Sequence, residues 1–330
     1  MSQSETESKS IASESELEVV GREGEELIVR HRQTGNVSRV VDTFAEMFPM
    51  WVGRVLITAA TEEWALTSAR AATGFAVSII MSPAEAGIEK TLPPEKTPDG
   101  RPGAVIQVYH TFGYGVKDQL IRRVGQCILT CPTTAAFNAM EGAKKRLKIG
   151  ASLRFFGDGF EKKDKIGNRT VWRIPVMEGE FLIEDRFGVK RGVAGGNFLI
   201  LAKDQKAGLE SAVRAAEAIR RVEGAVLTFP GGVCRSGSKV GSMKYKLPAS
   251  TNNPFCPTLK SVAGSQLPAE VNSVYELVIN GLDLQAVKQA MTEGVKAALR
   301  VPGVVKITAA NYGGKLGPYR AYLKEALELS

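Results

Sequence analysis

The amino-acid sequence predicts an α+β fold of two similar lobes, each with the element order strand, helix, strand, strand, helix, strand. The first observation is that apolar strand patterns and amphipathic helix patterns follow this order twice along the chain. The second is that each copy carries a long Gly- and Pro-rich insertion before its third strand. The third is an ordinary globular composition, with 44% hydrophobic and 24% charged residues. This element order is that of a ferredoxin-like α/β sandwich, and the weak internal similarity indicates duplication.

The elements of the first copy begin with an apolar strand at residues 54–59. Thr61 is a predicted helix N-cap, and Glu62 and Glu63 follow in the favourable first turn. This helix should end at Gly74, and the β-rich run 75–81 predicts the second strand. The second predicted helix of this copy follows a strand at 104–110 and has an apolar stripe of Val116, Leu120, Val124 and Ile128.

The second copy repeats this plan. A helix after the first strand ends at Gly224, and Asp283 is the predicted N-cap of the second helix. Its predicted strands are at residues 198–202, 225–229, 273–280 and 304–310. Right-handed crossovers place the first and third strands of each copy at the centre of its sheet. The predicted central strands are therefore those near 54–59, 104–110, 197–202 and 273–280.

The chain is predicted to have three parts: an extension of residues 1–41, an N-terminal lobe of residues 42–177 and a C-terminal lobe of residues 178–330. Eleven of the first 18 residues are Ser or Glu, so the extension should be disordered. Residues 25–32 alternate enough to add an edge strand instead. Residues 150–190 should supply extra strands that link the lobes.

Several classes of protein are excluded. No apolar run reaches the roughly 20 residues of a membrane span, and the polar start differs from a signal peptide. We therefore expect a soluble, cytoplasmic protein. Four cysteines and two histidines are too few for a zinc site or a disulfide scaffold, so we expect no metal. The strands at 55–59 and 198–202 offer only one aromatic ring, Phe198, and no segment matches the RNP1 pattern, which argues against RNA binding by such a fold.

Glu276 is the strongest candidate for catalysis. In the strand 273–280, alternation places Glu276 with Val274 and Val278, on the face opposite Tyr275 and Leu277. A carboxyl group between valines loses hydration, so its pKa should rise towards neutrality, where it can exchange protons. The alternative is a structural Glu paired with an Arg at a lobe contact.

The second candidate is the glycine-rich segment 231–242. Glycines free its backbone to approach a ligand, and donors to phosphate or carboxylate are supplied by Arg235, Ser236, Ser238, Lys239 and Ser242. The segment is not a Walker A loop, because its Lys is displaced by one residue. A plain surface turn is the alternative. Outside the extension, 38 basic residues face 27 acidic ones, which suits anionic ligands.

Ten segments in order carry a resemblance to a known family. They are residues 83–88 (PAEAGI), 97–103 (TPDGRPG), 124–127 (VGQC), 155–160 (FFGDGF), 192–197 (GVAGGN), 229–232 (FPGG), 236–242 (SGSKVGS), 247–252 (LPASTN), 275–281 (YELVING) and 310–317 (ANYGGKLG). From residue 42 onward, the chain resembles the formylmethanofuran:tetrahydromethanopterin formyltransferases. That family includes the archaeal enzyme and a subunit of the bacterial formyltransferase/hydrolase complex.

The resemblance implies two ferredoxin-like lobes and a formyl transfer between N5 of a tetrahydromethanopterin-type pterin and the amine of a methanofuran-type cofactor. It gives Glu276 the role of general acid/base. It also implies substrate binding by Arg235, Ser236, Ser238, Lys239, Ser250, Thr251, Asn252 and Asn197. Both carriers are anionic and act as co-substrates, without a prosthetic group or metal.

The implied partners are copies of the chain, as a homotetramer, or the other subunits of a formyltransferase/hydrolase complex. Neither nucleic acid nor membrane is implied. The alternative function is a non-catalytic subunit that binds the furan cofactor or assembles such a complex. The intact segments 231–242 and 275–281 favour the enzyme.

Overall fold

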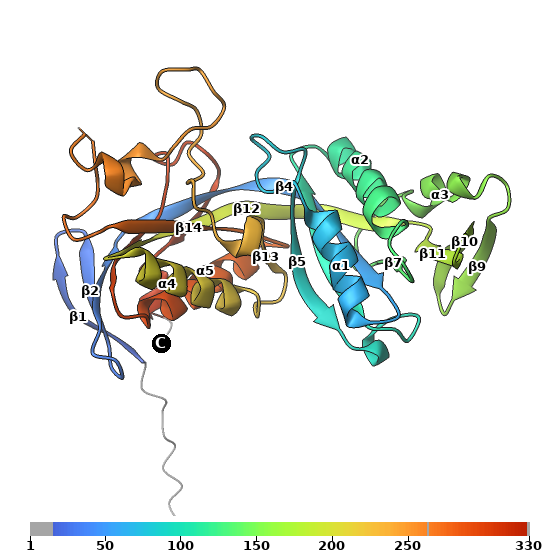
Figure 1. Ribbon diagram of the computed structural model, residues 1–330, viewed down its shortest axis with the longest axis horizontal. Coiled ribbons are helices and arrows are strands. Elements are labelled where there is room, and N and C mark those ends of the chain that lie inside the picture. The colour runs from blue at the N-terminus through green and yellow to red at the C-terminus, as the bar shows by residue number, and fades with distance from the viewer. Residues whose placement is uncertain (1–15, 263, 329–330) are drawn as a thin grey trace, which may run out of the picture.

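The computed structural model describes residues 16–262 and 264–328 and has two lobes (Figure 1). The elements of the N-terminal lobe are β4 (Phe44–Thr58), α1 (Glu62–Thr73), β5 (Glu85–Leu92), β6 (Gly103–His110), α2 (Gly113–Arg123) and β7 (Ala135–Asn138). Strand β4 pairs with β6 and β7, and β6 pairs with β5, all antiparallel. The resulting order β5-β6-β4-β7 has the first and third strands in the middle, as predicted.

The C-terminal lobe repeats this arrangement. Its elements are β12 (Phe187–Ala202), α4 (Gln205–Ile219), β13 (Ala225–Leu227), β14 (Ser273–Gly281), α5 (Leu284–Leu299) and β15 (Val304–Thr308). The strand order is β13-β14-β12-β15, again antiparallel. The prediction of two ferredoxin-like lobes is therefore confirmed.

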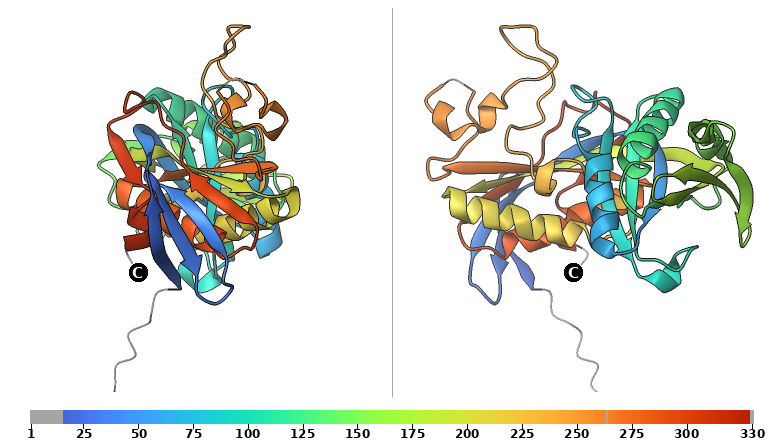
Figure 2. Two further views of the ribbon diagram at one scale, coloured as in Figure 1. Left: turned by 90° about the vertical axis from the view of Figure 1, so that its left-hand side faces the viewer. Right: turned by 45° about the vertical axis from the view of Figure 1, so that its right-hand side comes forward.

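The first strands of the two lobes pair with each other. Both β4 and β12 are longer than predicted, and residues 48–53 of β4 pair with residues 189–194 of β12. One mixed sheet therefore runs through the molecule (Figures 1 and 2). Its parallel pairs among the described residues are β7–β11 and β3–β15; the remaining pairs are antiparallel.

One predicted strand is wrong. Residues 75–81 form a loop, and the second strand of the lobe is β5, whose sequence contains Glu85, Glu89 and Lys90. Both glutamates are buried: Glu89 accepts two hydrogen bonds from Arg54, and Glu85 accepts one from Asn280. Partners on distant elements make these charges compatible with a strand.

The prediction of disorder is wrong for residues 17–41. They form β1 (Leu17–Glu23), β2 (Glu26–His31) and β3 (Val37–Val41), which extend the sheet of the C-terminal lobe beyond β15. Val29 and Val40 are fully buried in the core of that lobe. Their burial stabilises the extra strands despite the polar composition. Residues 1–15 lie outside the described residues.

The predicted extra strands are present, but not all of them lie between the lobes. They are β8 (Lys145–Leu147), β9 (Lys162–Ile166), β10 (Arg169–Val176) and β11 (Gly179–Glu184), with the short helix α3 (Gly150–Leu153) between the first two. Strands β9 to β11 continue the N-terminal sheet beyond β7, so they do not lie between the lobes. Residues 177 and 178, where the sequence analysis places the lobe boundary, form the turn between β10 and β11.

The last described elements are β16 (Tyr319–Tyr322), which pairs with β4, and the short helix α6 (Glu325–Glu328). No helix in residues 16–262 and 264–328 is long and apolar enough to cross a membrane.

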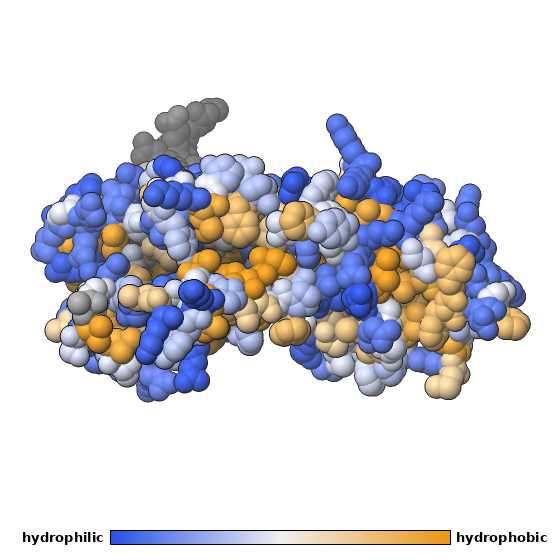
Figure 3. Space-filling model, turned by 90° about the horizontal axis from the view of Figure 1, so that it is seen from above, coloured by the Kyte–Doolittle hydropathy of each residue, from blue (hydrophilic) through white to orange (hydrophobic). Residues whose placement is uncertain are grey.

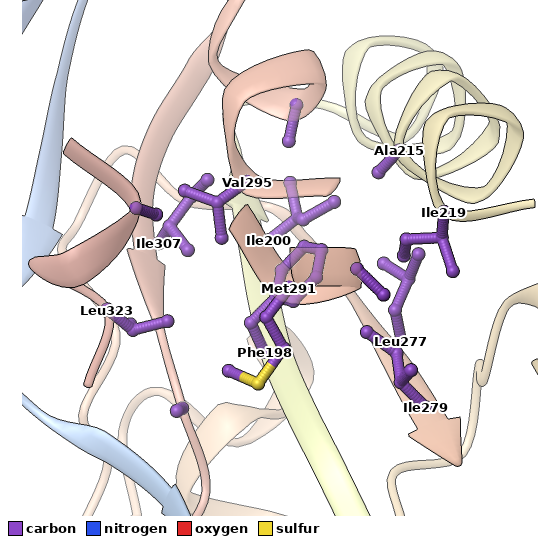
Figure 4. Packing of buried hydrophobic residues seen from close by; sticks show 14 of the residues in the cluster. Phe198, Ile200, Ala215, Ile219, Leu277, Ile279, Met291, Val295, Ile307 and Leu323 are labelled. Atoms are coloured by element: carbon purple, nitrogen blue, oxygen red, sulfur yellow. The ribbon is translucent and has the colours of Figure 1, made fainter. Parts of the chain in front are cut away.

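Helices α4 and α5 cover one face of the C-terminal sheet. Figure 4 shows Phe198, Ile200, Leu277 and Ile279 of the sheet packed against Met291 and other helix residues. In Figure 1 the segment between β13 and β14 lies over the opposite face. Residues of β14 with even numbers, including Glu276 and Asn280, therefore face this segment.

Candidate active site

Glu276 is held by the loop that covers it. Cys234 and Glu276 form an antiparallel bridge, with backbone hydrogen bonds of 2.7 and 3.0 Å in the two directions. This bridge aligns the following glycine-rich turn with β14. The Ser238 backbone N–H then donates to Oε2 of Glu276 at 2.7 Å, and the Ser238 hydroxyl donates to Oε1 at 2.6 Å.

The surroundings of Glu276 favour its neutral form. The residue is 2% exposed, and burial raises the pKa of its carboxyl group, while the two hydrogen bonds from Ser238 partly offset this effect. Among the described residues Glu276 forms no ion pair with a cation, so the structural Arg partner considered above is not present. The expected direction of the pKa shift agrees with the structure.

A cleft of about 650 Å³ lies beside this carboxyl group and is lined by both lobes and by the C-terminal segment. Ser238 lines it, and its two donors connect the cleft wall to Glu276. Apolar side chains form much of the wall, among them Phe48, Ile79, Phe229 and Val278. Seen from above, hydrophobic residues gather in the middle of the molecule between polar ones (Figure 3).

Four of the eight predicted binding residues line this cleft: Ser238, Lys239, Asn252 and Asn197. The Lys239 ammonium donates to Oδ1 of Asn253 at 2.6 Å. Asn197 has a structural task, because its side chain donates to the carbonyls of Gly195 and Ala310 and accepts from the Ala310 N–H. It holds the C-terminal segment against β12.

The other four predicted residues do not line the cleft. Arg235 and Ser236 are exposed on the turn before it. Ser250 donates to the carbonyl of Gly241 at 2.6 Å, and the Thr251 hydroxyl lies 3.2 Å from the Cys256 sulfur. These contacts fold the loop itself. Their roles in binding stay predictions.

Several cleft residues were not among the residues predicted from the sequence. Glu85 and the loop 77–80 line it from the N-terminal lobe, and Asn311 and Tyr312 line it from the C-terminal segment. The Tyr312 hydroxyl accepts a hydrogen bond from the Val240 N–H at 2.9 Å, so this segment is tied to the glycine-rich loop. Glu85, Asn311 and Tyr312 lie in the segments 83–88 and 310–317, which carried the family resemblance but did not identify these residues as part of a site.

Two further polar residues near the turns of the N-terminal lobe, His110 and Asp158, have structural roles. The His110 Nδ1 accepts a hydrogen bond from the Phe112 N–H at 3.0 Å, which fixes the turn before α2. Asp158 has φ of 52°, a left-handed turn conformation that Asp tolerates. No group of three or more His, Cys, Asp or Glu side chains with metal-binding geometry occurs in the part of the chain that the structure describes.

Comparisons with known proteins agree with this architecture. Residues 34–176 match the family described as "Formylmethanofuran-tetrahydromethanopterin formyltransferase", and residues 179–326 match "FTR, proximal lobe". The formylmethanofuran–tetrahydromethanopterin formyltransferase of Methanocaldococcus jannaschii is 56% identical over 294 residues, which is 88% of this chain and 98% of that protein. The corresponding protein of Methanopyrus kandleri is 52% identical, with the same coverage.

Two solved structures are also similar. The enzyme from Methanosarcina barkeri superimposes with a TM-score of 0.85 at 50% identity, covering 87% of this chain and 97% of that one. A chain of the formyltransferase/hydrolase complex from Methylorubrum extorquens, solved with methylofuran, gives 0.84 at 45% identity, covering 88% and 97%. With both lobes matched and identities of this size, the chain belongs to the formylmethanofuran–tetrahydromethanopterin formyltransferase family.

Proposed function

We propose that this protein transfers a formyl group between the amine of a methanofuran-type carrier and N5 of a tetrahydromethanopterin-type carrier, with Glu276 as general acid/base. The observation that carries the proposal is the buried carboxyl group of Glu276, which pairs with no cation among the described residues. Two hydrogen bonds hold it beside a cleft large enough for small organic carriers. The names of the relatives supply the reaction and both substrates.

The chemistry requires one group that first accepts a proton and then delivers it. The attacking amine adds to the carbon of the formamide, which gives a tetrahedral intermediate, and the original amine then leaves. The attacking nitrogen must lose a proton and the leaving nitrogen must gain one. A carboxyl group whose pKa is raised by burial suits both steps better than an ordinary glutamate does.

The oxyanion of the intermediate needs a hydrogen-bond donor from the cleft. Both donors of Ser238 are already used by Glu276. Asn252 lines the cleft, and its side-chain amide forms no hydrogen bond with the described residues. This amide is therefore a candidate donor. Such donors are typically worth about 3–4 kcal/mol in the transition state.

We also propose that the protein works in the cytoplasm as an oligomer, either a homotetramer or a subunit of a formyltransferase/hydrolase complex. Support comes from exposed aromatic side chains outside the cleft. Phe112 and Tyr114 stack with ring centroids 5.3 Å apart, and Phe155, Phe156 and Phe160 are exposed near α3. Clusters of this kind are typical of protein interfaces. Native mass spectrometry of the purified protein distinguishes the two assemblies.

The test of the function is a direct assay of formyl transfer. The purified protein, with any subunits that co-purify, is incubated with a formylated furan carrier and the tetrahydropterin, and both products are measured by mass spectrometry. We expect turnover by the wild type and its near-complete loss in Glu276→Gln. Binding of the furan carrier without any turnover would instead support a non-catalytic subunit.

A further inference from the structure

Glu85 is a second buried carboxyl group of the cleft, and it comes from the opposite lobe. It is the first residue of β5, is 6% exposed and lines the cleft. Its Oε1 accepts a hydrogen bond from the Ile79 N–H at 2.9 Å, and its Oε2 accepts one from Nδ2 of Asn280 at 2.6 Å. The two lobes therefore meet at this side chain.

The surrounding hydrogen bonds leave Glu85 with spare acceptor positions. The Gly195 N–H donates to Oδ1 of Asn280 at 3.2 Å, so the amide is oriented with its Nδ2 towards Glu85. Each oxygen of Glu85 thus accepts one hydrogen bond from the protein. A carboxylate oxygen can accept two, so one position on each oxygen is left.

Glu85 differs from the structural carboxylates of this protein. Glu89 pairs with Arg54 at 2.6 Å, and Glu184 pairs with Arg169 at 2.7 Å. Among the described residues Glu85 has no such cation, and burial raises the pKa of its carboxyl group. A buried carboxyl group without a cation destabilises a fold, so its position on a ligand cleft indicates a task in binding.

The position of Glu85 separates it from the reacting groups. Its partner Asn280 lies four residues after Glu276 on the same face of β14, which places their Cα atoms about 13 Å apart. The Val278 side chain lies between them on this face and lines the cleft. Glu85 is therefore suited to a remote part of a substrate and not to the proton transfer.

The chemistry of the two carriers indicates which of them Glu85 would bind. Spare carboxylate positions accept N–H donors and repel anionic groups. The anionic tail of the furan carrier fits Lys239 on the other wall better. A pterin ring carries two adjacent donors, a ring N–H and an amino group, at the end away from N5. Its flat faces fit the apolar side chains of Ile79 and Phe229.

We propose that Glu85 binds the pterin substrate by accepting hydrogen bonds from its ring N–H and its amino group, and so determines specificity for a pterin. This inference rests on the proposed function, because that function supplies the pterin. It adds the orientation of the ring: the donor edge lies at Glu85 and N5 lies towards Glu276.

The first test is a binding titration of the purified protein with the tetrahydropterin, using the variant Glu85→Gln. We expect affinity for the pterin to fall about 10- to 100-fold, since a pair of hydrogen bonds to a charged group is lost. Affinity for the furan carrier and the maximal rate at saturating pterin should stay within about threefold. Unchanged pterin affinity would overturn the inference.

A swapped pair separates binding from a structural role. In the double variant Glu85→Gln with Asn280→Asp, the new amide donates to the new carboxylate, and the Ile79 and Gly195 N–H groups keep their acceptors. Asn280 is fully buried, so the relocated charge does not reach the cleft. We expect thermal stability to recover but pterin affinity to stay low. Recovery of pterin affinity would show that Glu85 is only structural.

A pterin analogue with oxygen in place of the amino group completes the test. The wild type should bind it about 10-fold more weakly than the pterin, whereas Glu85→Gln should hardly distinguish the two. Equal discrimination by both proteins would contradict the contact. If the wild type binds no pterin at all, the proposed function itself fails; wild-type binding with unaltered affinity in Glu85→Gln overturns only this inference.

Discussion

Replacement of Glu276 by Gln should remove catalysis while it leaves the site folded. The variant keeps the size of the side chain. Its carbonyl oxygen can accept the hydrogen bond from the Ser238 N–H, and its amide can donate to the Ser238 hydroxyl, which also accepts. The change therefore removes little besides the ability to exchange a proton.

The expected loss in kcat is about 10²–10⁴-fold, the usual contribution of general acid–base catalysis. This corresponds to about 2.7–5.5 kcal/mol in the activation barrier. KM for both carriers should change only a few-fold, because Glu276 is 2% exposed and lies behind Ser238 at the cleft wall. A large loss in kcat with little change in KM identifies an interaction needed in the transition state.

The assay is steady-state formyl transfer measured over a range of pH, together with direct titration of each carrier. The plot of the wild-type rate against pH should change slope at the pKa of Glu276. This change should lie above the pKa of an ordinary glutamate, because burial raises the pKa of Glu276. The change in slope should disappear in the variant. Glu184→Gln is the matched control, since Glu184 is also buried but contacts Asn138 and Arg169 away from the cleft.

The role of Glu276 as general acid/base would be refuted if Glu276→Gln bound both carriers and retained a rate within a few-fold of the wild type. An equal loss in Glu184→Gln would also refute it, since the effect would then reflect general destabilisation. Circular dichroism and the melting temperature of each variant show whether the fold is intact.

Three further predictions concern binding, folding and pH. Lys239→Met should raise KM for an anionic carrier and weaken the dependence of KM on salt. Arg235→Met, which changes a residue outside the cleft, should have a smaller effect on both; steady-state kinetics at two ionic strengths test this. Removal of residues 1–41 should lower the melting temperature by about 5 °C or more, because the buried Val29 and Val40 are lost; a shift below 1 °C would contradict this. Burial raises the pKa of Glu276 in the folded state, so its stabilising contribution is present at low pH and is lost as pH rises through that pKa. The melting temperature of Glu276→Gln relative to that of the wild type should therefore increase from pH 4 to pH 8. A constant difference would argue against the raised pKa.

Features set by neighbouring residues could be predicted from the sequence. The Thr61 hydroxyl accepts from the Trp64 N–H and the Asp283 carboxylate accepts from the Ala286 N–H, as their positions before the helices indicated. Alternation along β14 correctly placed Tyr275 and Leu277 in the core and Glu276 on the other face. These signals are reliable because capping and strand alternation depend on residues close in sequence.

Strands stabilised by distant partners could not be predicted in this way. The run 75–81 is more apolar than β5, yet β5 is the strand. Gly87 of β5 packs so closely against β13 that an added Cβ would lie 2.6 Å from the Leu227 carbonyl oxygen. The sequence pattern assigns this segment to the Gly- and Pro-rich insertion. Its charges are compatible with a strand because Arg54 and Asn280, which are far away in sequence, bind Glu89 and Glu85.

The sequence by itself determined the two-lobe fold, the family and the candidate base Glu276. Tertiary structure alone decided which residues hold the buried carboxyl groups of Glu276 and Glu85 beside and within the cleft. Ser238 reaches Glu276 across 38 positions, and Asn280 reaches Glu85 across 195. The physical reason is that burial and hydrogen bonding between the lobes depend on how whole sheets pack. A charged residue in the sequence does not show whether its partner is water or a side chain from the other lobe.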